Sequence, residues 1–440
     1  MTTALPTLTG RDDETPDHGH PALWTSLLPP SAHGDDGICA VSAEGMYVRF
    51  ADGSELLDGD SGLWNANLGH GNRHIAEACH QALLNASYLS VFRYEHPYAR
   101  RAAEALVELC GADHFARVLF STSGGAANDL VMKTARHYHA LRGAEKRKII
   151  VGLRGSYHGL TFGGFALTGE NLGQQVYGVD QRLVRHVTPN DPADIEKLMR
   201  AQGSQIAAVV VEPVLGSGAV PLTDEYLQTL FRLREEHGFL LAADEVATGF
   251  GRTGSMFASQ RWSERPDLLV TSKGLTNGTC AAAAVIVSRT IADAFREADA
   301  TLTHGETQAG TPVTCAAIIA TIEEMRRLDA VSRGRRAAET LGAHLDRLVA
   351  EHPLFDSHDG RGLFRSLRIV TADGEPLPQA RVLDQIAAIR AAGAIVHAGV
   401  HGIQIMPPLT ATDAEIDALM EAVRTGVESF SATSVAGGAR

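Results

Sequence analysis

The chain has 440 residues, of which 44% are hydrophobic and 21% are charged, and its formal net charge is −13. This length fits two or three domains, and this composition is typical of an ordinary globular protein. The negative charge argues against a nucleic-acid partner, and no apolar run reaches the roughly 18 residues that a membrane span needs. The five cysteines contain no CxxC pair, and the histidine pairs 70/74 and 137/139 have no third ligand nearby. Neither a disulfide framework nor a metal site is therefore predicted.

The N-terminal part of the chain predicts an arm followed by a hairpin. Residues 1–20 are polar and lack the basic and apolar regions of a signal peptide, which predicts a cytoplasmic protein. Residues 1–35 are rich in proline, glycine and charge and predict an irregular segment. Alternating apolar residues over 46–57 predict a hairpin, and helical spacing follows at 75–86 and 99–110.

From residue 117 onward, short apolar runs alternate with helical stretches. The runs are Val118–Ser121, Ile149–Gly152, Ala207–Glu212, Phe239–Asp244, Leu268–Thr271 and Ala282–Val287, and the helical stretches include 126–141 and 225–237. This alternation predicts an α/β fold in which a mostly parallel sheet is covered by helices.

After residue 314 the pattern changes. One long helical stretch over 316–351 is followed by shorter segments at 363–371, 384–392 and 403–405, which indicate a smaller α+β domain. We therefore expect three parts in the chain. Residues 1–60 form an arm and part of the small domain, residues 61–325 form the large domain, and residues 326–440 complete the small domain.

Chemistry is expected where the apolar runs end, because ligands of open α/β sheets bind beyond the carboxyl ends of the strands. The run 239–243 ends in Asp244, and a buried acid needs a cationic partner or a strong donor, such as a protonated pyridine nitrogen. The run 268–271 is followed by Lys273. Burial of a lysine at that point lowers its pKa and makes its amine a nucleophile toward carbonyls.

A glycine-rich turn follows the first run. The sequence Thr122-Ser123-Gly124-Gly125-Ala126 leads into a helix, and backbone N–H groups at a helix N-terminus suit a phosphate. Taken singly, each of these features is more often structural. Together, the carboxylate, the lysine and the turn match the needs of pyridoxal phosphate (PLP), namely charge at the ring nitrogen, an imine partner and a phosphate anchor.

The segment at 242–254, AADEVATGFGRTG, strongly resembles the signature of class III aminotransferases, which are PLP enzymes of fold type I. The resemblance continues through SKGLTNG at 272–278, covers nearly the whole chain, and is nearest by eye to diaminopelargonate synthases and ω-transaminases. It implies a fold type I PLP transferase, whose large domain has a mostly parallel seven-stranded sheet, with a smaller α+β domain. It also implies a homodimer with shared active sites, in which a small-molecule amine donor passes its amino group to a ketone or aldehyde acceptor.

The resemblance assigns a role to individual residues. Lys273 is implied to be the Schiff-base lysine and proton shuttle, and Asp244 the partner of the pyridine nitrogen. The other implied cofactor contacts are Gly124 and Gly125 at the phosphate, Tyr157 and Val246 on the two ring faces, His158 and Glu212 near the cofactor, and Thr307, which would reach the phosphate of the neighbouring subunit. Trp64, Arg93 and Tyr94 fall where relatives line the substrate pocket.

The sequence departs from the family at two places. The phosphate turn reads SGGAA at 123–127, where relatives commonly have Ser-Gly-Ser/Thr-Glu-Ala, and the lost hydroxyl predicts weaker retention of the cofactor. Counting back from Pro407, His397 falls where many relatives carry an arginine that binds a substrate carboxylate. Either the substrate lacks a carboxylate near its reacting carbon, or the alignment is shifted and Arg93 or another arginine serves instead.

The favoured hypothesis is an aminotransferase of specialised metabolism that acts on a ketone without a nearby carboxylate. One setting is the biosynthesis of a peptide natural product of the daptide kind, in which the C-terminal residue of a modified peptide has become a ketone. Three alternatives stay open: a diaminopelargonate-type or ω-amino acid transaminase; an aminomutase, epimerase or lyase on the same fold; and a non-catalytic protein with this fold.

Overall fold

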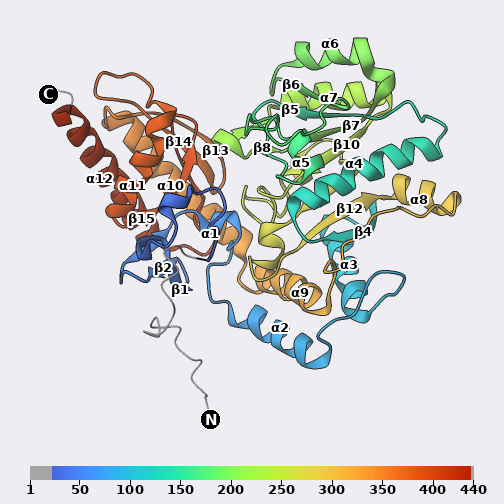
Figure 1. Ribbon diagram of the computed structural model, residues 1–440, viewed down its shortest axis with the longest axis horizontal. Coiled ribbons are helices and arrows are strands. Elements are labelled where there is room, and N and C mark those ends of the chain that lie inside the picture. Colours follow the sequence, from blue (N-terminus) through green and yellow to red (C-terminus); the bar gives the residue numbers. More distant parts are fainter. Residues whose placement is uncertain (1–21, 438–440) are drawn as a thin grey trace.

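The computed structural model describes residues 22–437, with side chains to residue 431, and is built around a seven-stranded sheet (Figure 1). The strand order is β4-β12-β11-β10-β7-β5-β6. These strands are β4 (Phe115–Ser121), β5 (Ile149–Leu153), β6 (Val184–Val187), β7 (Ile206–Val211), β10 (Leu240–Asp244), β11 (Leu268–Thr271) and β12 (Ala283–Ser288). Strand β12 runs opposite to the other six strands of this sheet, which confirms the predicted α/β fold with a mostly parallel sheet.

Helices cover both faces of this sheet, which explains why its strands read as continuous apolar runs. In β10, Leu240 and Ala242 pack into one core cluster, whereas Leu241 packs into another on the opposite face. The first cluster includes residues of α4 (Gly124–Leu141), α5 (Phe162–Leu167) and α8 (Arg289–Glu297), and the second includes residues of α6 (Pro192–Gln202) and α7 (Asp224–His237). Helices α2 (Arg73–Asn85), α3 (Pro97–Cys110) and α9 (Pro312–Arg327) pack together beside β4 and β12.

A second part of the molecule carries two four-stranded sheets. The first is β13 (Phe355–Arg361), β14 (Phe364–Ile369), β17 (Gly402–Ile405) and β16 (His397–Gly399), packed with α10 (Ala330–Glu351), α11 (Val382–Ala391) and α12 (Asp413–Gly437). The second joins β1 (Ala40–Glu44), β2 (Tyr47–Phe50) and β3 (Glu55–Asp58) to β15 (Ala394–Ile395). Because Leu57 pairs with Ala394, the N-terminal hairpin lies with the C-terminal elements (Figure 1).

Some local predictions hold and others are wrong. The hairpin over 46–57 is confirmed as β2 and β3. The single helix predicted over 316–351 is wrong, because the chain turns between α9 and α10 at Asp329, whose φ is +46°. Strand β6 was not predicted, since its sequence VRHV is short and polar at its centre.

Within residues 22–437, no helix combines the length and the apolar character that a membrane span requires.

Candidate active site

Most of the predicted site residues come together at the carboxyl edge of the sheet, where ligands of such folds bind. Asp244 ends β10, Glu212 directly follows β7, and Lys273 lies two residues beyond the end of β11. All three line a cavity of about 380 Å³. The cavity is also lined by the predicted residues Trp64, Gly124, Gly125, Tyr157, His158 and Val246.

Asp244 is a buried carboxylate with several hydrogen-bond partners. Its Oδ2 lies 2.7 Å from His158 Nδ1 and accepts from Asn128 Nδ2 at 2.8 Å, and its Oδ1 accepts from the Val246 N–H at 3.1 Å. Burial alone raises the pKa of this carboxyl, but the partners outweigh burial and hold the pKa below its ordinary value. The same contact raises the pKa of the buried His158 against the effect of its own burial. The acid thus stays ionised, as a partner for a protonated pyridine nitrogen requires.

The phosphate turn forms the first turn of α4. The Ser123 side chain accepts a hydrogen bond from the Ala126 N–H at 3.2 Å and caps this 18-residue helix, whose N-terminal N–H groups attract anions. A side chain on Gly124 would be crowded, because a Cβ there would lie 3.2 Å from both Val246 Cγ atoms, which would have to shift by a few tenths of an ångström. A Cβ on Gly125 would lie 3.2 Å from Thr161 Oγ1, so the threonine fills part of the space that a larger residue would need.

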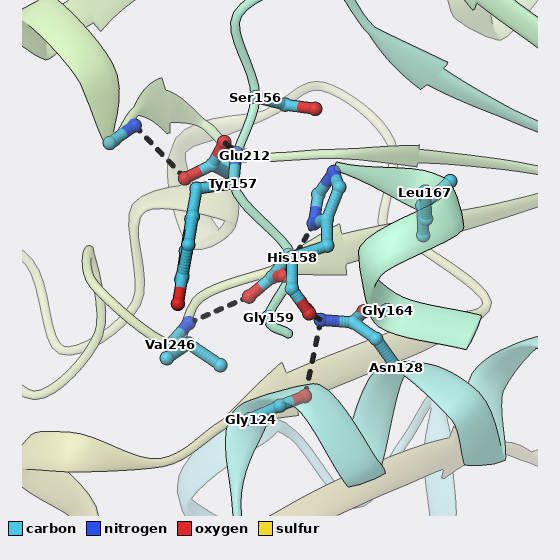
Figure 2. A network of polar contacts seen from close by, with 12 residues as sticks. Gly124, Asn128, Ser156, Tyr157, His158, Gly159, Gly164, Leu167, Glu212 and Val246 are labelled. Atoms are coloured by element: carbon cyan, nitrogen blue, oxygen red, sulfur yellow. Dashed lines mark hydrogen bonds and ion pairs between the residues drawn. The ribbon is translucent and has the colours of Figure 1, made fainter. Parts of the chain in front are cut away.

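Glu212 fixes the backbone beneath the cavity. Its two carboxylate oxygens accept from the N–H groups of Tyr157 at 3.0 Å and Gly216 at 2.9 Å, and Figure 2 shows Glu212 next to Tyr157. Burial raises the pKa of Glu212 to about 7, although the nearby His158 opposes the shift. Tyr157 itself is partly exposed and lines the cavity. Glu212 therefore holds the segment that carries Tyr157 and His158.

Lys273 adopts a left-handed backbone conformation, with φ +45°, which is uncommon for a residue with a side chain. Its Nζ lies 4.3 Å from the centre of the Trp64 ring. Loss of solvation lowers the pKa of the amine to about 8, against the opposing charges of Asp244 and Glu212. A substantial fraction of this amine is therefore neutral and nucleophilic at ordinary pH.

Trp64 and His397 meet although 333 positions in the sequence separate them. Trp64 ends a turn at 61–64 in which all four residues have positive φ, between 49° and 68°. Such a turn costs roughly 1–2 kcal/mol for each residue with a side chain, so the surrounding packing must hold it in place. The His397 ring lies 5.2 Å from the Trp64 ring, edge to face, and its Nδ1 lies 3.6 Å from Asp60 Oδ2.

Four predicted residues do not line the cavity of their own chain: Arg93, Tyr94, Thr307 and His397, whose ring packs against Trp64 instead. Arg93, Tyr94 and Thr307 are all exposed. They belong to two neighbouring segments, because the Tyr88 hydroxyl donates to the Thr307 carbonyl oxygen at 2.9 Å and the ring of Phe92 packs against Gly305. Their assignment to the site stays a prediction.

Two further residues organise the site and were not predicted. Asn128 Nδ2 lies within hydrogen-bond distance of the carbonyl oxygens of Gly124 and His158, as well as Asp244 (Figure 2). The sequence feature that could have predicted this role of Asn128 was its position one helical turn after Gly124. Arg252 is fully buried and donates to the Pro407 carbonyl oxygen and to Asn67 Oδ1, at 2.5 and 2.7 Å. The one sequence feature that could have predicted a role for Arg252 was its place within residues 242–254, which resemble the family signature.

These observations fit PLP. A buried carboxylate, a lysine of lowered pKa and a glycine-rich helix start surround one cavity, and each meets one chemical need of the cofactor. Among the described residues, no group of three potential metal-ligating side chains occurs. The arrangement can bind a phosphate, keep a pyridine nitrogen protonated, and offer an amine to a carbonyl.

Comparisons with known proteins agree with this geometry. The family described as aminotransferase class-III matches residues 31–427. An omega-aminotransferase from Caulobacter vibrioides is 33% identical over 431 residues, which cover 92% of this chain and 96% of that protein. An adenosylmethionine-8-amino-7-oxononanoate aminotransferase from Nitratidesulfovibrio vulgaris is 32% identical over 421 residues, 88% of this chain and 76% of that protein.

A solved structure gives the same result for the fold. The PLP-bound amine transaminase from an uncultivated Pseudomonas species has a TM-score of 0.88 and 29% identity to this chain, and covers 93% of this chain and 99% of its own. The family match and the shared fold thus agree with each other. The chain belongs to the class III aminotransferases and is a PLP-dependent aminotransferase.

Proposed function

We propose that this aminotransferase moves an amino group from a small-molecule amine donor to a ketone or aldehyde whose reacting carbon bears no carboxylate. The observation that carries the proposal is the position of His397 beside Trp64, with its Nδ1 toward Asp60. Among the described residues, no arginine lines the cavity. A neutral imidazole cannot form the two-pronged contact by which a guanidinium holds a carboxylate.

The residues of the chain divide the chemistry among them. When bound, PLP supplies an aldehyde carbon and an electron-withdrawing ring. Asp244 holds the negative charge that keeps the ring nitrogen protonated, and His158 and Asn128 hold Asp244 in place. Lys273 would move a proton away from the donor carbon and later return one to the acceptor carbon.

A matched pair of donors tests the proposal. Isopropylamine and alanine differ only in a methyl group or a carboxylate on the reacting carbon. We expect single-turnover assays of the PLP-loaded enzyme to favour isopropylamine in kcat/KM by tenfold or more, and His397→Arg to shift the preference toward alanine. A charge-assisted contact worth about 1.5–3 kcal/mol corresponds to such a change. A preference for alanine that disappears on Arg93→Ala would instead support the shifted alignment.

The same assay separates transamination from other PLP reactions. An aminotransferase releases a carbonyl product and leaves the amino group on the cofactor, whereas an aminomutase, epimerase or lyase does not end its cycle in that form. Pyridoxamine phosphate in stoichiometric amount supports the proposal. Its absence during turnover would favour one of those alternatives.

We also propose a homodimer with shared active sites. Exposed apolar side chains gather near the segment of Thr307, among them Tyr88, Phe92 and Tyr94. Glu306 accepts from Ser121 Oγ at 2.5 Å and from the Thr122 N–H at 3.1 Å, which anchors this segment beside the phosphate turn. Mixing inactive Lys273→Ala and Thr307→Ala subunits should restore part of the activity if Thr307 serves the neighbouring site, and no activity should return if it serves its own.

The biological setting follows from the substrate proposal. An acceptor without a carboxylate suits specialised biosynthesis, and a peptide whose C-terminal residue has become a ketone is one such acceptor. We place the enzyme in the cytoplasm, where PLP and amine donors are at hand. Turnover of a synthetic peptide ketone, compared with the corresponding peptide acid as an inert control, tests this setting.

A further inference from the structure

The phosphate turn has few means of holding its own shape. Gly124 and Gly125 carry no side chains, and glycine loses more conformational freedom on folding than any other residue. Strand β4, which leads into the turn, lies at the edge of the sheet, so Ser121 at its end has a strand partner on one side only. Bonds from other parts of the chain must therefore keep the N–H groups of the turn aligned toward a ligand.

Glu306 supplies such bonds through both of its carboxylate oxygens. Its Oε1 accepts from Ser121 Oγ at 2.5 Å, and its Oε2 accepts from the Thr122 N–H at 3.1 Å and from the Thr122 hydroxyl. Burial raises the pKa of Glu306, but these donors outweigh burial and hold the pKa below its ordinary value. The group is therefore a charged acceptor, which binds N–H and O–H donors more strongly than a neutral one does. Its bonds end at the residue directly before Ser123, the cap of α4.

The segment that carries Glu306 is itself held in place. The Tyr88 hydroxyl donates to the Thr307 carbonyl oxygen at 2.9 Å. A Cβ on Gly305 would lie 2.4 Å from Phe92 Cζ, so the aromatic ring packs directly against the backbone there. The side chain of Glu306 is only 20% exposed, and His304 Nε2 lies 3.5 Å from its Oε1. Glu306 is thus fixed on two sides and can act as a support for the turn.

Two effects of Glu306 on a bound phosphate have opposite signs. Its negative charge repels a phosphate, whereas its bonds restrict the backbone that presents the N–H groups. Three donors point at the carboxylate and partly offset its charge, and Glu306 does not itself line the cavity. On the other side of the turn, Asn128 Nδ2 donates to the Gly124 carbonyl oxygen at 3.2 Å (Figure 2). The turn is thus tied at both ends.

We propose that Glu306 is a positioning residue of the phosphate turn. It fixes the backbone at Thr122, so that the N–H groups of Gly124 and Gly125 are ordered before the phosphate of PLP arrives, and the cofactor does not have to order two glycines on binding. This inference is independent of the acceptor substrate. It rests on the predicted role of Gly124 and Gly125 at the phosphate.

The test compares PLP with pyridoxal, which lacks the phosphate. The dissociation constant of each is measured by fluorescence titration of the apoprotein. We expect the wild type to bind PLP more tightly, and Glu306→Ala to raise the dissociation constant of PLP tenfold or more. The dissociation constant of pyridoxal should stay within about twofold, because pyridoxal can meet Lys273 and Asp244 without using the turn.

Further variants separate the bonds of Glu306 from its charge. Glu306→Gln removes the charge but keeps an acceptor oxygen, so it should recover most of the affinity for PLP. Ser121→Ala removes one donor and leaves the charge, so it should raise the dissociation constant of PLP a few-fold. Glu297→Ala, at an exposed acid on α8, is the matched control and should bind PLP as the wild type does.

A background variant separates this role from the proposed contact across the dimer. Thr307→Ala removes the side chain that is proposed to reach the neighbouring phosphate. In this background Glu306→Ala should still raise the dissociation constant of PLP tenfold or more. If the effect of Glu306→Ala disappears there, Glu306 acts through Thr307, and the inference is overturned while the shared site is supported.

The remaining outcomes are equally decisive. An unchanged or lowered dissociation constant of PLP in Glu306→Ala overturns the inference, since charge repulsion would then be the larger effect. An equal rise for PLP and pyridoxal also overturns it, because the loss would then be a general one of structure. A wild type that binds both ligands equally tightly would instead contradict the phosphate role of Gly124 and Gly125, on which the inference rests.

Discussion

The lowered pKa of Lys273 gives a quantitative prediction for the apoprotein. Loss of solvation brings this pKa to about 8, whereas an ordinary lysine titrates at about 10.4. At pH 7.5 the neutral fraction is then about 0.24 for Lys273 and about 0.001 for an ordinary lysine, a ratio of roughly 200. The rate of reaction with an aldehyde should rise with pH through a midpoint near 8, because only the neutral amine attacks.

Stopped-flow mixing of apoprotein with PLP between pH 6 and pH 10 measures this profile by the absorbance of the imine. Glu212→Gln removes a negative charge that raises the pKa of Lys273, so the midpoint should move below 8. Lys273→Ala should show no imine band, and Lys133→Ala, on the outer part of α4, is a control for surface lysines. A midpoint near 10 in the wild type would refute the argument that burial activates the amine.

Two further predictions concern the cofactor site. Asp244→Ala leaves His158 buried without its partner at 2.7 Å. The free energy of unfolding of the apoprotein, measured in urea, should therefore fall by about 3–5 kcal/mol. A loss below about 1 kcal/mol would contradict an ion pair between Asp244 and His158. Gly125→Ser adds a hydroxyl at the phosphate turn and should lower the PLP dissociation constant tenfold or more, measured by fluorescence titration, provided that Thr161 yields a few tenths of an ångström. An unchanged dissociation constant would show that the backbone N–H groups and Thr161 already suffice.

The arrangement of the site was predictable where one local pattern fixes both element and chemistry. Asp244 and Lys273 each follow an apolar run, and parallel strands bring their carboxyl ends to one edge, so the structure places both in one cavity. Asn128 was missed because its role depends on three acceptors that converge from different segments. The break at Asp329 was missed because no glycine or proline marks it.

The sequence by itself determined the family and the sheet and predicted Lys273 as the reacting lysine, because periodicity and contiguous motifs are local properties of the chain. Only the tertiary structure decided which distant residues share the site. It brought His397 from β16 to Trp64 and Asp60, and it placed Arg93 and Thr307 outside the cavity of their own chain. Such contacts between residues far apart in sequence depend on how two packed parts of the chain meet, and no local pattern records them. The chemistry of Lys273 could therefore be predicted from the sequence, whereas the contacts that orient His397 required the fold.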